Sequence, residues 1–195
     1  YQGQNLGMVQ WQLFGVHNVS NALSAAAAAH AVGVTPEVII DALQSFQGVK
    51  RRLEVVGCHN EVTLYDDFAH HPTAILGGIT SLRARVGESQ RIVVMLQFGS
   101  RSMQLGLHQQ ELIAALSGAD EVVLLNSPEL SWDIHDWSKQ LANNVSCYDS
   151  VDEIINEWGQ ALRPHDHVLM MSNKSFDGLH HRLYRRLQES GASST

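Results

Sequence analysis

From about residue 53 onward, short apolar runs alternate with longer segments of helical periodicity. The runs short enough to be strands cover residues 53–58, 62–67, 92–98, 121–125, 145–148 and 167–171. The helical patterns cover residues 72–86, 108–116, 132–142, 151–162 and 178–187. Strands that alternate with helices in this way are typical of a mainly parallel sheet with helices on both faces. We therefore expect an α/β fold in which a hairpin joins the first two strands.

The first 48 residues show a different pattern. Residues 8–14 alternate apolar and polar side chains, which predicts a strand. An alanine-rich helix is expected over residues 18–31. A second helix is expected after Thr35-Pro36-Glu37, because a hydroxyl, a proline and an acid are typical of a helix start.

Gly48 ends this second helix, and the basic triplet Lys50-Arg51-Arg52 follows it. We therefore expect a domain boundary near residues 48–52. The larger domain would cover residues 49–188. The remaining residues, 189–195, are small and polar, which predicts a disordered tail.

The composition indicates an ordinary soluble protein. Hydrophobic residues make up 44% of the chain and charged residues 17%, which is typical of a globular domain with a buried core. The formal net charge of −7 argues against binding to nucleic acid or to a membrane surface. Cys58 and Cys147 form no CxxC pair, and no signal-peptide pattern opens the chain, so we expect a reducing, cytoplasmic location.

The segment Asp66-Asp67-Phe68-Ala69-His70-His71-Pro72-Thr73 places four ionisable side chains between a strand and a helix. Open α/β sheets bind ligands at this edge, and helix amino ends favour anions. Asp67 fits contact with a ribose hydroxyl pair or with Mg²⁺, and the two histidines fit phosphate contact or proton exchange. Two alternatives remain open. One histidine could cap the helix, or Asp66 and both histidines could begin a zinc site.

Two further loops follow parallel strands at the same expected edge, Gln97–Met103 and Ser172–Gly178. Both are rich in small polar residues, and each carries one cation. These residue types suit a ligand that carries a carboxylate. His165-Asp166-His167 precedes a strand at the opposite edge, so we expect a turn there rather than a metal site.

Three polar residues near the start of the chain are candidate nucleotide contacts. Asn18 and Asn21 lie three residues apart at a helix start, and a side-chain amide matches the N6/N7 edge of adenine. The alternative is that Asn18 or Ser20 caps the helix. Arg52 suits bidentate phosphate binding at the expected boundary, or it is an exposed linker charge. Neither a GxxxxGK[ST] loop nor a GxGxxG motif occurs in the sequence.

Three motifs occur in a fixed order: GVHNVSNAL at Gly15–Leu23, RRLE at Arg51–Glu54 and DDFAHHPTAI at Asp66–Ile75. This ordered set resembles the Mur ligase family. The resemblance implies that residues 49–188 form a Rossmann-like C-terminal domain that presents an incoming peptide. It also implies that residues 1–48 are the tail of a central ATP-binding domain.

The resemblance further implies an ATP- and Mg²⁺-dependent ligase. It would join UDP-N-acetylmuramate to the tripeptide L-Ala-γ-D-Glu-meso-diaminopimelate in peptidoglycan recycling, through an acyl phosphate that the peptide amine attacks. Because the phosphate-binding loop is absent, we expect this chain to be inactive alone, and no catalytic residue is assigned to it. The residues implied to bind ATP are Asn18, Asn21, Arg52, Asp67, His70 and His71. Those implied to bind the peptide are Ser100, Arg101, Ser172, Asn173 and Phe176.

Both expected peptide loops depart from the family's pattern. Gly99 stands where the most similar members tend to carry arginine, and Lys174-Ser175 stands where they carry two glycines. A second hypothesis is therefore a non-catalytic α/β module that binds a nucleotide or a cell-wall peptide. A third hypothesis is a metal-dependent hydrolase built on the Asp66–Pro72 segment, which would require stoichiometric zinc.

Overall fold

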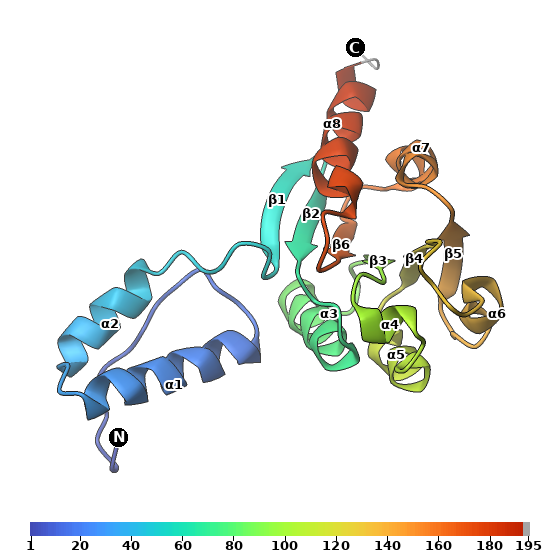
Figure 1. The fold of residues 1–195 in the computed structure, drawn as a ribbon. Coiled ribbons are helices and arrows are strands. Elements are labelled where there is room, and N and C mark those ends of the chain that lie inside the picture. The colour runs from blue at the N-terminus through green and yellow to red at the C-terminus, as the bar shows by residue number, and fades with distance from the viewer. Residues whose placement is uncertain (193–195) are drawn as a thin grey trace. The chain divides into compact units, whose positions relative to one another are not determined.

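The computed structural model describes residues 1–192 of the chain. It divides into two compact units, Tyr1–Val49 and a larger unit that begins at Lys50 (Figure 1). In the part of the chain that the structure describes, no helix is both long and apolar enough to span a bilayer.

The first unit consists of two helices and an irregular leading segment. The helices are α1 (Val16–Ala31) and α2 (Pro36–Ser45). Thr35 takes the N-cap position of α2, with Pro36 in the first turn as expected. The strand expected over residues 8–14 does not form. That prediction was wrong because alternation makes a strand only where another strand pairs with it, and no strand is present among the residues of this unit.

Neither helix of the first unit contains a buried residue. Val16, Val19, Leu23 and Val38 are all exposed. An open groove of about 550 Å³ lies between the leading segment, α1 and α2, and it is lined mainly by apolar side chains, Val19 and Leu23 among them. The unit thus lacks the closed apolar core that gives a small domain its stability.

The second unit is built on a six-stranded sheet in the order β1-β2-β6-β3-β4-β5 (Figure 1). Its strands are β1 (Glu54–His59), β2 (Val62–Asp67), β3 (Ile92–Gln97), β4 (Glu121–Leu125), β5 (Asn144–Tyr148) and β6 (His167–Met171). Only β1 and β2 pair antiparallel, as the expected hairpin between them requires, and the other pairs are parallel. The central strands are continuous apolar runs because helices cover both of their faces. The expected α/β fold is confirmed.

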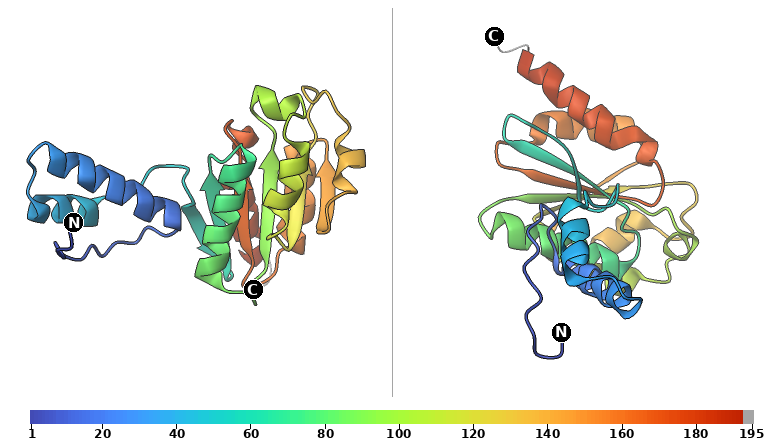
Figure 2. Two further views of the ribbon diagram at one scale, coloured as in Figure 1. Left: turned by 90° about the horizontal axis from the view of Figure 1, so that it is seen from below. Right: turned by 90° about the vertical axis from the view of Figure 1, so that its left-hand side faces the viewer.

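Helices cover both faces of this sheet, as the two views in Figure 2 show. They are α3 (Pro72–Val86), α4 (Arg101–Gln104), α5 (Gln109–Leu116), α6 (Ile134–Ser138), α7 (Val151–Ala161), the 3₁₀ turn η1 (Phe176–Gly178) and α8 (Leu179–Ala192). Helices α3 and α5 contact each other on one side, and α7 and α8 do so on the other. A large apolar core fills the space between the sheet and the α7–α8 layer.

Helices α6 and α8 differ most from the sequence-based expectation. Helix α6 begins after Asp133, whose Oδ1 accepts hydrogen bonds from the amides of His135 and Asp136, rather than after Ser131. Helix α8 continues through residues 189–192, where a disordered tail was expected. An α-helix makes its own backbone hydrogen bonds, so it can extend past the buried Leu187. The rest of the expected tail, residues 193–195, lies outside the described residues.

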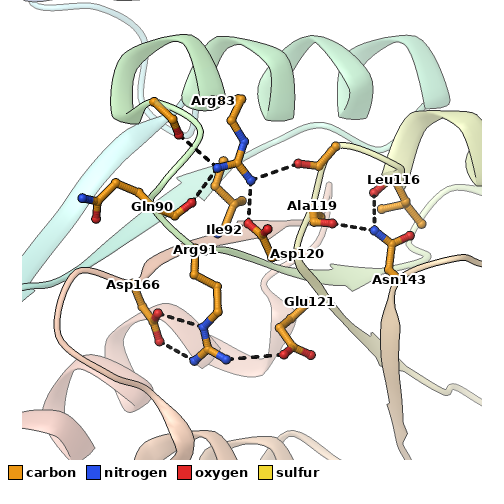
Figure 3. A network of polar contacts seen from close by, with 12 residues as sticks. Arg83, Gln90, Arg91, Ile92, Leu116, Ala119, Asp120, Glu121, Asn143 and Asp166 are labelled. Carbon is orange, nitrogen blue, oxygen red and sulfur yellow. Dashed lines mark hydrogen bonds and ion pairs between the residues drawn. The ribbon is translucent and has the colours of Figure 1, made fainter.

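A polar network closes the edge of the sheet where the parallel strands begin (Figure 3). Arg91 donates to both oxygens of Asp166, at 2.9 and 2.6 Å, and forms an ion pair with Glu121 at 3.4 Å. Arg83 donates to Asp120 at 2.5 Å and to nearby backbone carbonyls. The segment around Asp166 is therefore structural, in agreement with the turn expected there.

The same edge yields a prediction about pH. His167 Nδ1 lies 3.1 Å from the Tyr65 hydroxyl oxygen, and burial lowers the pKa of His167 below its usual value. The unfolded chain therefore takes up this proton more readily than the folded one, and the free energy of unfolding should fall as the pH drops from about 7 to about 5. In urea titrations at the two pH values, His167→Gln is expected to show a smaller fall than wild type. In the exposed control His135→Gln, the free energy of unfolding should fall as much as in wild type. An unchanged pH dependence in His167→Gln would contradict the prediction.

Candidate functional site

Three loops meet at the carboxyl edge of the sheet, because β2, β6 and β3 are adjacent strands that run in the same direction. Ser172 joins them. Its amide donates to the Asp67 carbonyl at 3.1 Å, and its hydroxyl donates to Gln97 Oε1 at 2.6 Å. The hydroxyl also accepts from the Lys174 amide at 2.9 Å. Asp67 and the two predicted peptide loops therefore lie together at one edge.

Asp67 is buried, with 6% of its surface exposed. Its Oδ2 accepts a hydrogen bond from the Leu53 amide at 2.8 Å, and its Oδ1 accepts one from the Ala69 amide at 2.7 Å. The carboxylate thus fastens the chain that precedes β1 to the loop that follows β2. This structural task was not anticipated from the sequence.

The two arginines that precede β1 have different surroundings. Arg52 is exposed, and its guanidinium carbon lies 5.7 Å from the centre of the Phe68 ring. Arg51 lies on the same ring at 5.2 Å, but it also forms an ion pair with Asp66 at 3.1 Å. Sequence reasoning missed Arg51. The sequence signal was that Arg51 precedes β1, and that β2, the strand paired with β1, ends in Asp66 and Asp67.

The two histidines lie at the start of α3. The Nδ1 atom of His70 lies 2.9 Å from the Phe68 carbonyl oxygen, and its ring meets the Phe68 ring edge-on. His71 occupies the N-cap position and is exposed, but its side chain makes no capping bond. Its ring instead contacts that of His108, with 4.7 Å between ring centres. One histidine therefore takes the N-cap position, as the alternative expected, but its side chain does not cap the helix.

The loop after β3 passes directly beside the loop after β6. A Cβ atom added to Gly99 would overlap Oδ1 of Asn173 and would lie 3.0 Å from Cγ of Lys174. The two departures from the family's pattern, Gly99 and Lys174, are therefore neighbours in space. Ser100 is the N-cap residue of α4, and Arg101, its first residue, is exposed.

Phe176 does not face this edge. It is 2% exposed and belongs to the core between the sheet and α7 and α8. Burial makes Phe176 a packing residue, so we do not retain it as a ligand contact. Ser172 is 1% exposed, and its hydroxyl is engaged by Gln97 and Lys174, so it builds the loop.

Asn18 and Asn21 belong to the first unit. The amide nitrogen of Asn18 donates to the Phe14 carbonyl at 2.8 Å, so this side chain ties the start of α1 to the preceding turn. Asn21 is exposed. Asn21 is therefore the freer of the two to meet a ligand.

The zinc hypothesis finds no support. Within residues 1–192, no three His, Cys, Asp or Glu side chains come close enough to hold a metal ion. Asp66 is instead paired with Arg51. Asp66, His70 and His71 therefore form no common metal site.

Comparison with known proteins shows the family. Residues 51–174 match the family described as Mur ligase, glutamate ligase domain. Ligases from Haemophilus influenzae and Escherichia coli K12, both named UDP-N-acetylmuramate–L-alanyl-γ-D-glutamyl-meso-2,6-diaminoheptandioate ligase, are each 41% identical to this chain. The matches cover 96% and 93% of this chain, and 42% and 40% of the relatives. The chain therefore spans two fifths of the length of these curated relatives.

Solved structures agree. A murein peptide ligase from Psychrobacter arcticus is 33% identical, with a TM-score of 0.72 over 92% of this chain and 38% of that one. A domain of a UDP-N-acetylmuramate:L-alanyl-γ-D-glutamyl-diaminopimelate ligase from Haemophilus ducreyi is 41% identical, with a TM-score of 0.59 over 70% of this chain and 99% of that one. A UDP-N-acetylmuramate–alanine ligase from Thermotoga maritima, at 24% identity and a TM-score of 0.81, shares the fold. This chain belongs to the Mur ligase family.

Proposed function

We propose that this chain is the C-terminal part of an ATP-dependent amide-bond ligase. The ligase joins UDP-N-acetylmuramate to the tripeptide L-Ala-γ-D-Glu-meso-diaminopimelate in peptidoglycan recycling. Residues 1–48 are then the tail of the central ATP-binding domain, and the unit that follows is the peptide-acceptor domain. The observation that carries the proposal is the meeting of Asp67 and both loops at one sheet edge, in a chain 41% identical to ligases named for this reaction. A cytoplasmic location belongs to the proposal, because free Cys58 and Cys147 suit reducing conditions.

On the nucleotide side, one guanidinium and two imidazoles suit phosphate. Arg52 offers a planar guanidinium with several donors, and Phe68 supports it from one side. His70 and His71 lie close by at the start of α3. Asn18 and Asn21 are the proposed adenine contacts. These residue types fit the phosphates and the base of ATP.

Asp67 fits a ribose hydroxyl better than a magnesium ion. Each carboxylate oxygen already accepts one backbone N–H, and an ionised carboxylate has no hydrogen to donate, so a further ligand group must be a donor or a cation. A hydroxyl is such a donor, whereas a cation would compete with the two amide hydrogens. We assign no Mg²⁺ ligand to the described residues, although the proposed reaction as a whole uses Mg²⁺.

On the acceptor side, the loops after β3 and β6 supply Ser100, Arg101, Asn173 and the exposed Lys174. Two cations and two small polar groups suit a peptide that carries several carboxylates. The task of these residues is to hold the peptide so that its amine meets the activated carboxylate. Positioning of this kind can supply much of the acceleration of a transfer reaction.

A domain exchange tests the proposal. The matching C-terminal part of the Haemophilus influenzae ligase is replaced by this chain, and ATP-dependent formation of the UDP-linked tripeptide product is measured. We expect product from the chimera, and neither product nor phosphate release from this chain alone, because it lacks a phosphate-binding loop.

Two variants of the chimera sharpen this test. Arg52→Met should raise the KM for ATP, whereas Arg163→Met, an exposed arginine near the opposite sheet edge, should leave the kinetics unchanged. A folded chimera that binds nucleotide or tripeptide in calorimetry but forms no product would favour the second hypothesis, a non-catalytic binding module. Phosphate release by the isolated chain would contradict the expectation that this chain is inactive alone.

A further inference from the structure

The segment that leads into β1, residues 50–53, has a backbone that residues other than glycine rarely adopt. Arg51 has a φ of 58° and Leu53 a φ of 50°. Left-handed conformations at such residues are unfavourable, and they persist where surrounding contacts hold them. Specific contacts must therefore hold the lead-in segment, residues 50–53, in this conformation.

Arg51 supplies most of those contacts. Its backbone amide donates to Glu54 Oε2 at 2.7 Å, and its carbonyl accepts from the Phe68 amide at 2.7 Å. Its Nε donates to Asp66 Oδ2 at 3.1 Å. These bonds fasten the segment to the end of β2.

The outer end of the same side chain reaches across to the loop after β6. Its Nη2 donates to the Ser172 carbonyl at 2.6 Å and to the Lys174 carbonyl at 2.8 Å. A single guanidinium thus joins a carboxylate on β2 to two carbonyls of a loop more than 120 residues away in the chain. The planar, fixed arrangement of its N–H donors allows this, whereas a lysine ammonium could not reach all three acceptors at once.

We propose that Arg51 is a positioning residue that holds the lead-in segment and the Ser172–Lys174 loop in one fixed arrangement. Arg52 on the nucleotide side and Asn173 and Lys174 on the acceptor side are thereby mounted on one rigid piece. The assignment of the two sides rests on the proposed function, but the fixed arrangement itself does not. Arg51 acts through the backbone it holds and touches neither ligand.

Hydrogen exchange followed by NMR tests the positioning role without any ligand. In Arg51→Met, exchange of the Ser172, Lys174 and Phe68 amides should be at least tenfold faster than in wild type. The Leu169 amide, within β6, should be unchanged, which shows that the fold is intact. Arg52→Met is the matched control, and the same three amides should stay within twofold of wild type.

Arg51→Lys provides a second variant that keeps the charge. It should show an intermediate rise in exchange at Ser172 and Lys174, of about threefold, because an ammonium replaces only part of the guanidinium's bonds. It also carries the test if Arg51→Met does not fold. The proposal is overturned if these amides exchange at wild-type rates in a folded Arg51→Met variant. If only Arg51→Lys folds, wild-type exchange rates in that variant overturn it.

Kinetics in the chimera then separate positioning from direct binding. Arg51→Met should raise the KM for the tripeptide and the KM for ATP, each at least threefold, because it loosens the segments that carry both sets of contacts. Arg52→Met should raise only the KM for ATP. Arg51→Lys should restore part of both KM values, and wild-type KM values for both substrates in a folded Arg51→Met chimera would overturn the positioning role. An inactive chimera would instead count against the proposed function, and the exchange rates would still decide the role of Arg51.

Discussion

Replacing Arg91 with methionine is expected to lower the free energy of unfolding by about 3–5 kcal/mol, the range for removing one partner of a buried ion pair. Asp166 is the reason. Its side chain is only 3% exposed, and Arg91 donates to both of its oxygens. Hydrogen bonding to Asp166 raises the pKa of Arg91, which keeps the guanidinium charged. Without Arg91 the buried carboxylate would keep one bond from the Arg163 amide, at 2.8 Å.

Urea denaturation of the unit that begins at Lys50 measures this loss. The domain from Haemophilus ducreyi, solved on its own, supports the use of the unit in isolation. Asp166→Ala should be milder, at about 2–3 kcal/mol, since Arg91 is 22% exposed and regains water. The control is Lys139→Ala, which removes an ion pair between residues about three quarters exposed and should change stability by less than about 0.5 kcal/mol. A loss below 1 kcal/mol in Arg91→Met would contradict the structural role assigned to this network.

The central sheet and the edge where Asp67 meets the two loops could be predicted from the sequence because both depend on short-range patterns. Strand β3 is an unbroken apolar run, and such a run predicts a strand that helices cover on both sides. Once β2, β3 and β6 are taken as parallel, geometry requires that the loops after them lie at one edge. That is why Asp67, Ser100 and Ser172 could be grouped before any coordinates were known.

Other features could not be predicted because they depend on contacts between distant residues. Residues 8–14 have the alternation of a strand, but pairing decides whether a strand forms. Phe176 sits in a polar loop sequence, yet the turn of η1 places it in the core under α8. Arg51 and Arg52 are adjacent and chemically identical, and only the left-handed turn at Arg51 determines which guanidinium reaches Asp66.

Asp67→Ala is expected to lower the free energy of unfolding by about 2–4 kcal/mol, because it leaves two buried backbone donors without acceptors. Those donors are the amides of Leu53 and Ala69, residues that are 4% and 1% exposed. Asp67→Asn keeps the volume of the side chain but turns an N–H₂ group toward one of the two amide donors. It should therefore lose about 1–3 kcal/mol. Both losses are measured by urea denaturation of the same unit, together with amide exchange at Leu53.

Asp152→Ala is the control for these variants, because it also removes an aspartate, but an exposed one that pairs with Arg182. Its stability should stay within about 0.5 kcal/mol of wild type. The asparagine variant separates the two tasks of Asp67. If Asp67→Asn is destabilised as expected, the carboxylate is required by the fold, and any loss of ligase activity in the chimera follows from a displaced lead-in segment. If Asp67→Asn is as stable as wild type but raises the KM for ATP, the structural account is wrong, and the carboxylate is a direct nucleotide contact, because one oxygen then suffices to hold the backbone.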